Sequence, residues 1–449
     1  MDLDAIFKAY DVRGVVPDEL DEEAARRIGA AFATFAGAPR IAVGRDSRLS
    51  SPSLAEALAE GITATGTAVD DLGMITTDMV YFAAGRLDQP GAMVTASHNP
   101  KGYNGIKLCL AGAAPVGAAS GLVEVRELAE TLPPSGDPGP IVSTDLLSEY
   151  LDHLCQIVDP AGLAPLRVAV DGGNGVAGVA IPGLFERLPG ELLGLFLEPD
   201  GTFPNHHPDP LRPENLRDLE DLMAKASPDL GVAFDGDADR AFFIDDAGVP
   251  LSGSTVTSMV AAWFLEREPG ATIVHNLICS RAVPETVVAA GGTAVRTRVG
   301  HSYIKAVMAE TGAIFGGEHS GHYYFREHFR ADSGILTLLV LLQVISEAQL
   351  PVSELRRAHE PYLQSGEINL EVADVDAAID LVAGAFSASE QDRLDGLTVS
   401  PSSDRWFNVR PSNTEPVLRL NVEAADAAAV AALVDEVKGL IGEVVGVDS

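Results

Sequence analysis

The chain has 449 residues, which is too long for a single hydrophobic core and predicts three or four domains. Its 46% hydrophobic and 21% charged residues are typical of a globular protein. The formal charge of −34 argues against nucleic acid or an anionic membrane as a partner. Such a protein can hold an anionic ligand only in a locally positive pocket, so we expect its basic residues to be concentrated in a few motifs.

Cysteine usage and the apolar pattern indicate where the protein resides. Cys109, Cys155 and Cys279 have no metal-ligand spacing and cannot all pair with one another, which indicates a reducing compartment. The first residues are acidic and lack the pattern of a signal peptide. The longest apolar run, Ile335 to Ile345, is too short to cross a bilayer and predicts a buried helix. We expect a soluble, cytoplasmic protein, present as a monomer or weak dimer.

Strands and helices alternate along the chain, which predicts α/β layers. In the first part, strands are expected at 41–43 and 91–95, and a helix begins at Ser51-Pro52. The segment from Pro133 to Pro140 has the composition of a linker. The second part is expected to contain a helix over 146–158, a strand over 167–171, a buried strand over 230–234 and a hairpin from residue 241.

The third part repeats this pattern, with expected strands at 272–275, 294–297 and 313–315, helices from Ser280 and Gly300, and a long helix around 336–346. The segment between Pro351 and Pro361 predicts the next boundary. The last part reads strand–helix–strand–strand–helix and predicts a small α+β domain. The fold class is therefore α/β, with three successive mixed-sheet α/β domains (1–140, 141–249 and 250–357) and a small C-terminal α+β domain (358–449).

The segment from Thr95 to Pro100 places a serine just after a buried strand. Small and polar neighbours leave the Ser97 hydroxyl accessible on a loop, and Pro100 restricts Asn99 to an extended conformation. A nucleophile or a phosphoserine explains this pattern, and a polar turn explains it equally well. A Ser-His-Asp triad is a further possibility, but the adjacent His98 says nothing about geometry.

Three alternate carboxylates, Asp235, Asp237 and Asp239, follow another buried strand. They converge on one point only if a cation offsets their repulsion, and hard oxygen ligands select Mg²⁺ or Ca²⁺. An EF-hand loop would require glycine and glutamate where this chain has Arg240 and Asp246, which excludes that motif. An acidic surface turn is the remaining alternative. Arg240 is suited to hold a phosphoryl oxygen beside the metal.

Two further loops have the composition of ligand-binding segments. In the segment 316–322 a double glycine permits close approach of a ligand, and Glu318, Ser320 and His322 alternate as sugar-hydroxyl contacts would require. A glycine-rich turn is an equally good explanation. The segment 410–416 joins an arginine to hydroxyl and amide side chains, which suits a phosphate group, although a capping turn explains it equally well.

Together and in this order, the four motifs resemble the α-D-phosphohexomutase superfamily, and within it the phosphomannomutase/phosphoglucomutase group. The resemblance extends from Phe7–Gly14 to the Arg410 loop, essentially the whole chain. It implies four domains around a central cleft, each contributing one loop. The implied reaction is the reversible interconversion of hexose 6-phosphate and hexose 1-phosphate through phosphoserine and a hexose 1,6-bisphosphate. Mg²⁺ would be the cofactor and glucose 1,6-bisphosphate the activator.

The resemblance assigns chemistry to the first two loops. Ser97 corresponds to the phosphoserine, and one of its oxygens completes a metal site formed by Asp235, Asp237 and Asp239. Arg240 and the metal would stabilise the charge on the transferring phosphoryl group. The remaining catalytic candidates are His98, Lys107 and His322, of which Lys107 and His322 are alternative bases for the hydroxyl proton.

Substrate contacts are also implied by the resemblance. Glu318 and Ser320 correspond to the readers of sugar hydroxyls. The distal phosphate site corresponds to Arg410, Ser412, Asn413 and Thr414, and further substrate-binding positions are Tyr10, Arg13, His301 and His322. One departure is Ile278, where family members often have a basic residue. Either Arg281 or Lys305 replaces its function, or the substrate contacts differ.

The sugar specificity rests on His319 within the sequence Gly-Glu-His-Ser-Gly-His, which resembles enzymes that accept both mannose and glucose phosphates. The alternatives are a phosphoglucosamine mutase, a metal-dependent sugar phosphatase with water as acceptor, and a non-catalytic sugar-phosphate binder. The binder is disfavoured because binding alone does not require a serine beside three metal carboxylates.

Overall fold

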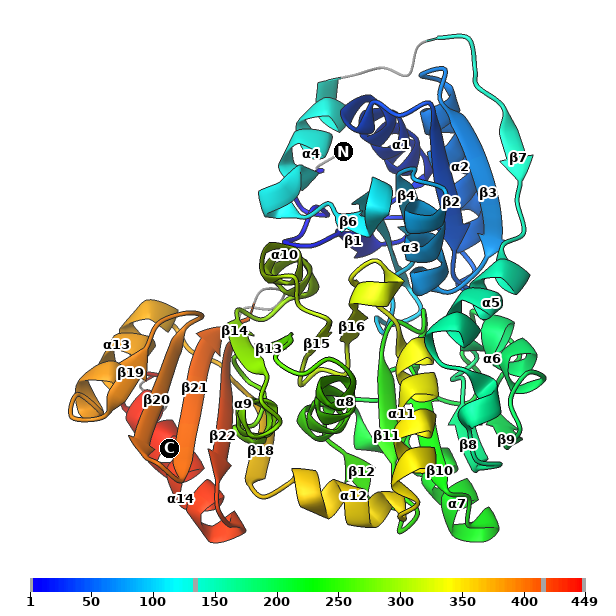
Figure 1. Ribbon diagram of the computed structural model, residues 1–449. Helices are drawn as coiled ribbons and strands as arrows, with labels where there is room; N and C mark the ends of the chain where they lie inside the picture. Colours follow the sequence, from blue (N-terminus) through cyan, green and yellow to red (C-terminus); the bar gives the residue numbers. More distant parts are fainter. Residues whose placement is uncertain (1–2, 132–135, 413–416, 446–449) are drawn as a thin grey trace.

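The computed structural model describes residues 3–131, 136–412 and 417–445, and its strands form four sheets. Each sheet is built from one consecutive part of the chain (Figure 1). The N-terminal part lies at the top of Figure 1, the second and third parts lie side by side below it, and the C-terminal part flanks the third. Three mixed sheets with helices and one antiparallel sheet confirm the expected fold class.

The first domain has a sheet of order β1-β5-β4-β2-β3-β7, with β6 beside β5. Its helices α1 and α2 touch at Gly29 and Gly61, where an added Cβ would lie 2.2 Å and 1.9 Å from backbone oxygens. Only glycine permits this contact. The elements are β1 (Val12–Val15), α1 (Glu22–Ala36), β2 (Arg40–Arg45), α2 (Ser51–Thr63), β3 (Ala68–Met74), α3 (Thr77–Arg86), β4 (Gly91–Val94), β5 (Tyr103–Leu110), β6 (Ala114–Pro115), α4 (Leu122–Thr131) and β7 (Ile141–Ser143).

The second domain has the sheet order β12-β11-β10-β8-β9. Strand β10 is buried along its whole length, because it lies inside the sheet with helices on its faces, which explains its continuous apolar sequence. The strands and hairpin expected here are confirmed. The elements are α5 (Leu147–Ile157), β8 (Arg167–Asp171), α6 (Ala177–Phe185), β9 (Glu191–Leu195), α7 (Arg217–Ala226), β10 (Leu230–Phe234), β11 (Ala241–Ile244) and β12 (Pro250–Leu251).

The third domain has the sheet order β14-β13-β15-β16-β17. The strand expected at 313–315 was placed two residues too early, since β15 covers 315–317 and includes the double glycine. The elements are α8 (Gly253–Arg267), β13 (Thr272–Asn276), α9 (Ala282–Ala289), β14 (Thr293–Thr297), α10 (His301–Thr311), β15 (Phe315–Gly317), β16 (Tyr323–Phe325), β17 (Ala331–Asp332), α11 (Gly334–Ala348) and α12 (Val352–His359).

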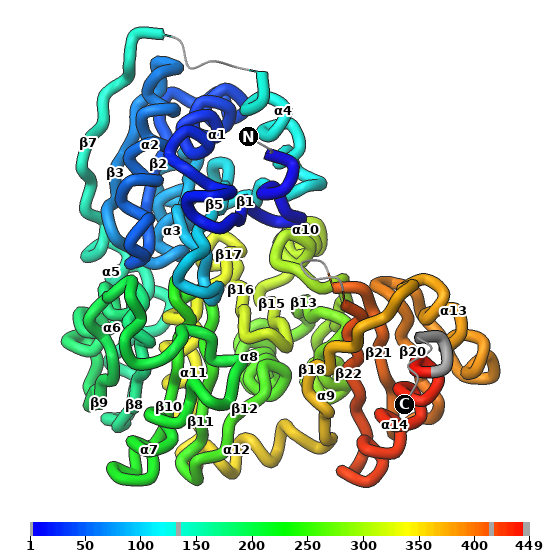
Figure 2. The backbone as a smooth tube through the Cα atoms, turned by 180° about the vertical axis from the view of Figure 1, so that it is seen from behind, coloured from blue at the N-terminus to red at the C-terminus, as the bar shows by residue number. Residues whose placement is uncertain are grey.

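The segment between Pro351 and Pro361, expected as a boundary, is the helix α12. The two prolines stand just outside its ends, where they interrupt no helical hydrogen bond. Figure 2 shows α12 running along the base of the third domain toward β18 (Leu363–Leu370), and it packs against α8. The third and fourth domains are therefore joined by a packed helix.

The C-terminal domain has the sheet order β18-β22-β21-β20-β19, antiparallel throughout. The expected pattern has two strands between the helices, whereas the fold has four there. β19 is only three residues long and polar, which explains why it was missed. The remaining elements are α13 (Val375–Ala385), β19 (Glu390–Asp392), β20 (Leu397–Ser402), β21 (Arg405–Pro411), β22 (Leu418–Ala424) and α14 (Ala427–Val445).

Helix α11 contains the apolar run that predicted a buried helix, and its residues 334–342 are buried. No single helix within the described ranges is long and apolar enough to span a membrane. Only α11 and α12 taken together meet the length and composition criteria, and they are bent by 99°.

The three α/β domains meet at the carboxylate of Asp78, at the start of α3. This buried carboxylate accepts hydrogen bonds from the hydroxyl of Tyr150 on α5 (2.5 Å) and from the hydroxyls of Thr76 and Ser333. Ser333 is also the N-cap of α11. Burial raises the pKa of Asp78 to about 6. The ionised carboxylate therefore depends on donors from all three domains.

Asp78→Ala is expected to lower the free energy of unfolding by about 3 kcal/mol, because it leaves three buried hydroxyl groups without their acceptor. Urea denaturation of the purified protein measures this loss. Asp152→Ala is the matched control, since Asp152 pairs with Arg187 at the surface and a pair of this kind contributes less than about 1 kcal/mol. A loss at Asp78 no larger than that of the control would show that the junction does not stabilise the fold.

Candidate active site

Each loop singled out in the α/β domains follows the carboxyl end of a strand that pairs in parallel with one of its two neighbours. Ser97 follows β4, Asp235 follows β10 and Glu318 follows β15. The carboxyl ends of parallel strands lie at the same edge of a sheet, so polar residues after them converge there. The Ser97 and Asp235 loops also meet each other across the domain boundary.

The Ser97 loop is in close contact with the second domain. Ser97 has a left-handed φ of 51°, its backbone N–H donates to Thr95 Oγ1 (2.9 Å), and the residue is only 3% exposed. A Cβ added at Gly236 would lie 2.5 Å from the carbonyl oxygen of Ser97. The glycine between Asp235 and Asp237 is therefore required for the acidic loop to reach the serine.

The hydroxyl of Ser97 is surrounded by polar groups. Ser97 Oγ donates to Asp235 Oδ2 at 2.6 Å, and Arg240 donates to Ser97 Oγ at 3.2 Å. The Nδ1 atom of His98 lies 3.1 Å from the same oxygen. Burial, together with the Arg240 charge, lowers the pKa of His98 well below its usual value. In the described part of the chain His98 hydrogen-bonds to no carboxylate, so the Ser-His-Asp triad is not formed.

The carboxylates of Asp235, Asp237 and Asp239 are buried and offer one oxygen each within 4.8 Å of one another. Lys107 Nζ lies 2.9 Å from Asp237 Oδ2 and also pairs with Asp239, and Thr77 Oγ1 donates to Asp237 Oδ2 (2.8 Å). Asp237 Oδ1 and Asp239 Oδ1 are buried and accept no hydrogen bond from any described residue. Buried carboxylate oxygens that accept no hydrogen bond are suited to bind a hard divalent cation such as Mg²⁺.

Burial and the neighbouring charges together raise the pKa of Asp235 and Lys107 in this cluster and lower the pKa of Asp239. Burial, with the neighbouring Asp239 and Asp237, raises the pKa of Asp235 well above its usual value. Burial also acts to raise the pKa of Asp239, but the charges of Lys107, His322 and Arg240 together outweigh it and hold the pKa at about 2. Burial acts to lower the pKa of Lys107, but Asp237 and Asp239 raise it well above normal. Lys107 is therefore a protonated cation between two carboxylates.

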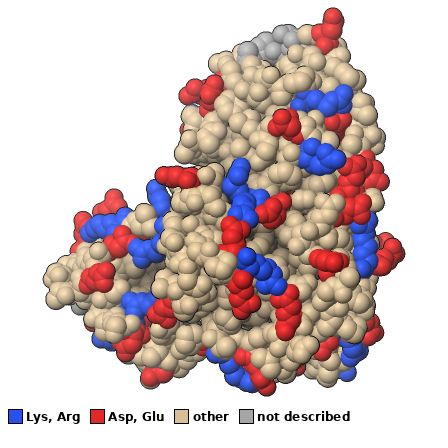
Figure 3. All heavy atoms as spheres, viewed as in Figure 1, with Lys and Arg blue, Asp and Glu red and all other residues tan. Residues whose placement is uncertain are grey.

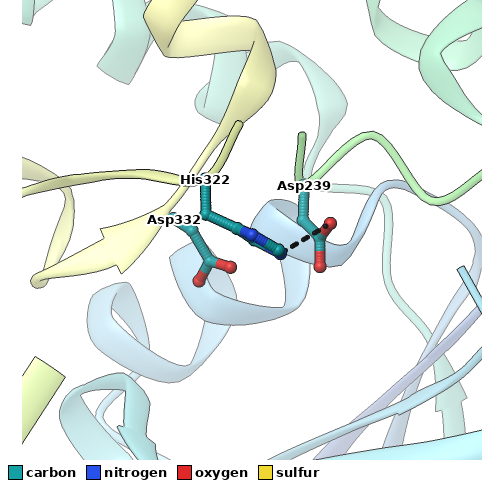
Figure 4. Close-up of side chains that lie close together, drawn as sticks. All are labelled: Asp239, His322 and Asp332. Atoms are coloured by element: carbon teal, nitrogen blue, oxygen red, sulfur yellow. Dashed lines mark ion pairs between the residues drawn. The ribbon is translucent and has the colours of Figure 1, made fainter. Parts of the chain in front are cut away.

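His322 joins the third domain to the acidic cluster, and Figure 4 shows its ring between Asp239 and Asp332. Its Nε2 atom lies 3.5 Å from Asp239 Oδ1, and its backbone bridges that of Arg240. Asp332 Oδ1 is 2.7 Å from Lys305 Nζ. Although Asp239, His322 and Asp332 have the spacing of a metal site, Lys305 already supplies a cation there.

Glu318 is held by three hydrogen bonds from within its own domain. Asn276 Nδ2 (3.0 Å) and the Gly300 N–H (3.3 Å) donate to one carboxylate oxygen, and the hydroxyl of Tyr324 donates to the other at 2.5 Å. These donors fix the carboxylate and leave it part of its capacity to accept from a sugar hydroxyl.

The other residues of this loop are also hydrogen-bonded. The hydroxyl of Ser320 lies 3.2 Å from His322 Nδ1, and His319 Nδ1 lies 3.0 Å from the hydroxyl of Ser254 at the start of α8. The loop is therefore held against the body of the third domain as well as by Glu318.

Arg13 and Tyr10, the residues of the first domain expected to bind substrate, lie in two different places. Arg13 donates to Asn99 Oδ1 and to Asp11 Oδ2, both at 2.5 Å, so it lies beside the Ser97 loop. The hydroxyl of Tyr10 donates to the carbonyl of Val299 at 3.0 Å, and its ring lies 5.3 Å from that of His301. Tyr10 therefore connects the first domain to the third.

The C-terminal arginine is buried and paired. Arg410 donates to Glu367 Oε2 at 3.0 Å, and its side chain is 2% exposed. Arg419, opposite Arg410 on β22, lies 3.0 Å from the other oxygen of Glu367. The backbone N–H of Ser412 donates to the carbonyl of Val417. Asn413 and Thr414 lie outside the described residues.

Ile278 stands where relatives often have a basic residue, and Arg281 and Lys305 were suggested to replace it. Both of these side chains are bound to other residues of the protein. Arg281 donates to the Ser403 carbonyl and the Ser400 hydroxyl of the C-terminal domain, while Lys305 pairs with Asp332. Arg298, which follows β14, has a side chain that is 49% exposed. It is more accessible to a ligand than either Arg281 or Lys305, and the sequence analysis did not name it.

Three partners of the site residues were not predicted. Thr77 donates to Asp237, Glu367 pairs with Arg410, and Arg48 donates to the Ser97 loop. Arg48 and Thr77 follow β2 and β3, whose carboxyl ends lie beside that of β4, and this signal could have indicated them. Glu367 reaches Arg410 only because β18 and β21 flank the same strand, β22.

In the comparison with known families, four profiles match successive parts of the chain, one for each of the four sheets. Profiles described as phosphoglucomutase/phosphomannomutase alpha/beta/alpha domains I, II and III match residues 4–130, 148–248 and 252–362. The profile of the C-terminal domain matches residues 367–440. The chain belongs to the phosphoglucomutase/phosphomannomutase family. This confirms the resemblance carried by the four motifs and identifies the protein as a phosphohexomutase.

Relatives of this phosphohexomutase match it over nearly its whole length. "Phosphohexose mutases" of Xanthomonas campestris pv. campestris is 41% identical over 443 residues, which cover 97% of this chain and 98% of that one. The phosphomannomutase of Escherichia coli K12 is 41% identical over 431 residues, covering 93% and 94%. The solved structure of a phosphoglucomutase/phosphomannomutase family protein from Burkholderia thailandensis has a TM-score of 0.92, with 34% identity over 100% of this chain and 99% of that one.

Proposed function

We propose that this phosphohexomutase interconverts the 6-phosphate and 1-phosphate of mannose, glucose or both, through phosphorylated Ser97 and a hexose 1,6-bisphosphate. The observation that carries the proposal is the hydrogen bond from Ser97 Oγ to Asp235 within a buried cluster that has two unsatisfied carboxylate oxygens. A serine in a polar turn requires no such cluster. The names of the phosphomannomutase and phosphohexose mutase relatives support the sugar class.

Asp235, Asp237 and Asp239, with an oxygen of phosphorylated Ser97, would hold Mg²⁺. When bound, the ion supplies positive charge that stabilises the transferring phosphoryl group. Arg240 supplies a second positive charge, since its guanidinium lies 3.2 Å from Ser97 Oγ. The protein is acidic, and on the face shown in Figure 3 acidic and basic side chains are intermingled. Arg240 and Lys107 are already paired with the three carboxylates, so a positive potential for an anionic substrate would come from these buried cations together with the bound ion.

The reaction has two phosphoryl transfers. In the first, the bond between Ser97 Oγ and phosphorus breaks, a bond forms to the free hydroxyl of the sugar monophosphate, and that hydroxyl loses its proton to a base, while Ser97 Oγ takes up a proton that it gives back in the second transfer. The product, hexose 1,6-bisphosphate, turns around in the site. In the second transfer its other phosphoryl group bonds to Ser97 Oγ, and the sugar oxygen that it leaves takes up a proton.

Of the two candidate bases, His322 is better placed than Lys107. The ammonium group of Lys107 is held between Asp237 and Asp239 and has no free lone pair while it is protonated. His322 is only half-buried and reaches the acidic cluster through Asp239, 3.5 Å away. It can therefore exchange a proton with a sugar hydroxyl near the phosphoryl group.

Arg410 and Ser412 would bind whichever phosphate is not reacting, together with Asn413 and Thr414, as the sequence predicts. Glu367 lies against Arg410 and Arg419, which directs the two guanidinium groups toward one place. Among the described residues, two arginines and one carboxylate meet there, and the paired guanidinium groups suit a phosphate.

Arg410→Ala is expected to raise KM by about 30- to 150-fold, since a charge-assisted contact to phosphate contributes about 2–3 kcal/mol. The variant should also release hexose 1,6-bisphosphate before it turns around, because the contact of Arg410 with the non-reacting phosphate is lost. Steady-state kinetics and chromatography of the released bisphosphate measure the two effects. Arg393→Ala is the matched control, because Arg393 pairs with Asp380 at the surface of the same domain. Unchanged KM and unchanged release at Arg410 would mean that this loop binds no phosphate.

Incubation with mannose 1-phosphate, with and without a trace of glucose 1,6-bisphosphate, tests the proposed function. We expect mannose 6-phosphate to form and the trace of bisphosphate to accelerate its formation. Inorganic phosphate as the main product would indicate a phosphatase, and binding without conversion would indicate a sugar-phosphate binder. Faster conversion of glucosamine phosphate than of mannose or glucose phosphate would assign the chain to the phosphoglucosamine mutases.

A further inference from the structure

Arg48 is a buried arginine whose guanidinium is directed at the Ser97 loop. It lies on the loop after β2, and its side chain is 0% exposed. Its two terminal nitrogens donate to four backbone carbonyls, those of Ser97 (2.8 Å), Asn99 (2.6 Å), Pro100 (2.9 Å) and Tyr103 (3.0 Å). A single side chain thus holds the loop from the serine to the start of β5.

The Nε–H group of Arg48 makes no hydrogen bond to a described residue, but it lies beside a carboxylate. Its Nε atom lies 3.2 Å from Asp46 Oδ2, and the other oxygen of Asp46 accepts from the Ser51 hydroxyl and from the Arg48 N–H. Asp46 thereby fixes the guanidinium at the start of α2. Burying a charge without hydration is costly unless it is paired and hydrogen-bonded, and Arg48 has four hydrogen bonds from its terminal nitrogens and the carboxylate of Asp46 beside its Nε atom.

Arg48 also connects the Ser97 loop to the second domain. Its guanidinium lies 5.4 Å from the centre of the Phe203 ring, and its backbone bridges that of Gly201. The loop that carries Phe203 and Gly201 comes from the same domain as the three metal carboxylates. Arg48 therefore touches both of the domains whose meeting forms the Ser97–Asp235 contact.

The backbone of Ser97 is strained, and the contacts of Arg48 with this loop affect where the Ser97 hydroxyl lies. A serine with a φ of 51° is held in a region that non-glycine residues seldom adopt, and it persists only where surrounding contacts impose it. The loop carbonyls are turned toward Arg48, which leaves Ser97 Oγ on the side of Asp235 and Arg240. If these four contacts were lost, we expect the loop to relax from this conformation and the hydroxyl to leave Asp235.

We propose that Arg48 is a positioning residue for the phosphorylation of Ser97: by binding the carbonyls of residues 97, 99, 100 and 103, it holds Ser97 Oγ in line with the metal cluster. The inference rests on the proposed function, in which Ser97 is the phosphorylated residue. It concerns the loading step, in which hexose 1,6-bisphosphate transfers one phosphoryl group to Ser97 Oγ. The sugar P–O bond breaks, the Oγ–P bond forms, and the serine proton passes to the sugar oxygen.

The inference is tested by comparing the wild type with Arg48→Lys and Arg48→Met. Each dephosphorylated protein is incubated with glucose 1,6-bisphosphate and Mg²⁺, and intact-mass spectrometry follows the phosphorylation of Ser97 over time. Lysine keeps the charge beside Asp46 but has three donors and no planar fork, so it cannot bind four carbonyls. We expect the rate of Ser97 phosphorylation to fall by about 100-fold in Arg48→Met, the size typical of a misplaced reacting group, and by at least about 10-fold in Arg48→Lys. The Kd for glucose 6-phosphate should change little, because the side-chain contacts of Arg48 in the described ranges lie at the Ser97 loop, Asp46 and Phe203, and none of them is with Arg410 or Ser412.

Arg356→Met is the matched control for a merely structural effect. Arg356 is largely buried and pairs with Asp245 at 2.8 Å, at the junction of the second and third domains. This variant also loses a buried ion pair, yet its rate of Ser97 phosphorylation should equal that of the wild type. If Arg48→Met does not fold, Arg48→Lys decides the question, because its charge remains paired.

The outcomes separate the inference from the proposed function. If wild-type protein takes no phosphate on Ser97, the proposed function fails. If wild-type protein is phosphorylated and a folded Arg48 variant is phosphorylated at the same rate, only the inference about Arg48 is overturned. A rate that falls equally in Arg48→Lys and Arg356→Met also overturns it, since both losses would then reflect stability.

Discussion

Ser97→Ala is expected to reduce mutase turnover by more than about 10⁴-fold, the scale seen when a covalent nucleophile is removed. No other hydroxyl lies within hydrogen-bonding distance of both Asp235 and Arg240 in the described part of the chain. The fold should be unaffected, because the Arg240–Asp235 ion pair remains when the hydroxyl is lost. Coupled assays of glucose 1-phosphate conversion measure the loss, and mass spectrometry should place phosphate on Ser97 in the wild type.

Ser53→Ala is the control for this experiment, since Ser53 is exposed on α2 and donates to Glu22. Its turnover and phosphorylation should equal those of the wild type. Undiminished turnover in Ser97→Ala would exclude the phosphoserine mechanism.

Asp237→Asn is expected to lower turnover by at least about 100-fold, because removing one preorganised charge from a phosphoryl-transfer site typically costs this much. Its unpartnered Oδ1 atom is one of the two oxygens available to a cation. An asparagine oxygen can still accept from Thr77, so the loop should keep its conformation. Mg²⁺ titrations of activity should show a higher half-saturating concentration, and calorimetry should show weaker Mg²⁺ binding.

Asp221→Asn is the matched control, since Asp221 pairs with Lys225 on the exposed face of α7 in the same domain. It should leave the Mg²⁺ dependence unchanged. If both chelation of Mg²⁺ and Asp237→Asn left turnover untouched, the three carboxylates would have only a structural role.

The effect of Asp237→Asn on stability shows how the tertiary structure changes an expectation based on sequence. Three carboxylates in a row predict repulsion, so removing one should stabilise the protein without metal. In the fold, Lys107 comes from β5 of another domain and pairs with two of them, and Arg240 pairs with the third. Because these cations already offset the repulsion, we expect the stability without metal to change little.

Local patterns in the sequence were sufficient to predict the strands before the Ser97 and Asp235 loops and the fold class. In the sequence a buried strand is a continuous apolar run, and the loop after its carboxyl end is recognised by its polar residues and glycine. The same local reasoning excluded an EF-hand. The four motifs in order then identified the family, as the profiles confirm. The two strands missed in the C-terminal domain and the helix α12 lacked a clear local pattern.

Only the tertiary structure decided which partners these motifs have. Ser97 meets Asp235 across 138 positions of the chain, and Asp78 meets Ser333 across 255. Arg48 and Glu367 act on loops that lie elsewhere in the sequence, so their own neighbours carry no sign of their roles. Arg281, expected as a possible ligand-binding cation, instead donates to the C-terminal domain. The reason is physical: a local pattern determines whether a residue is buried or turned to solvent, but its contact is chosen by surfaces that pack together only in the folded chain.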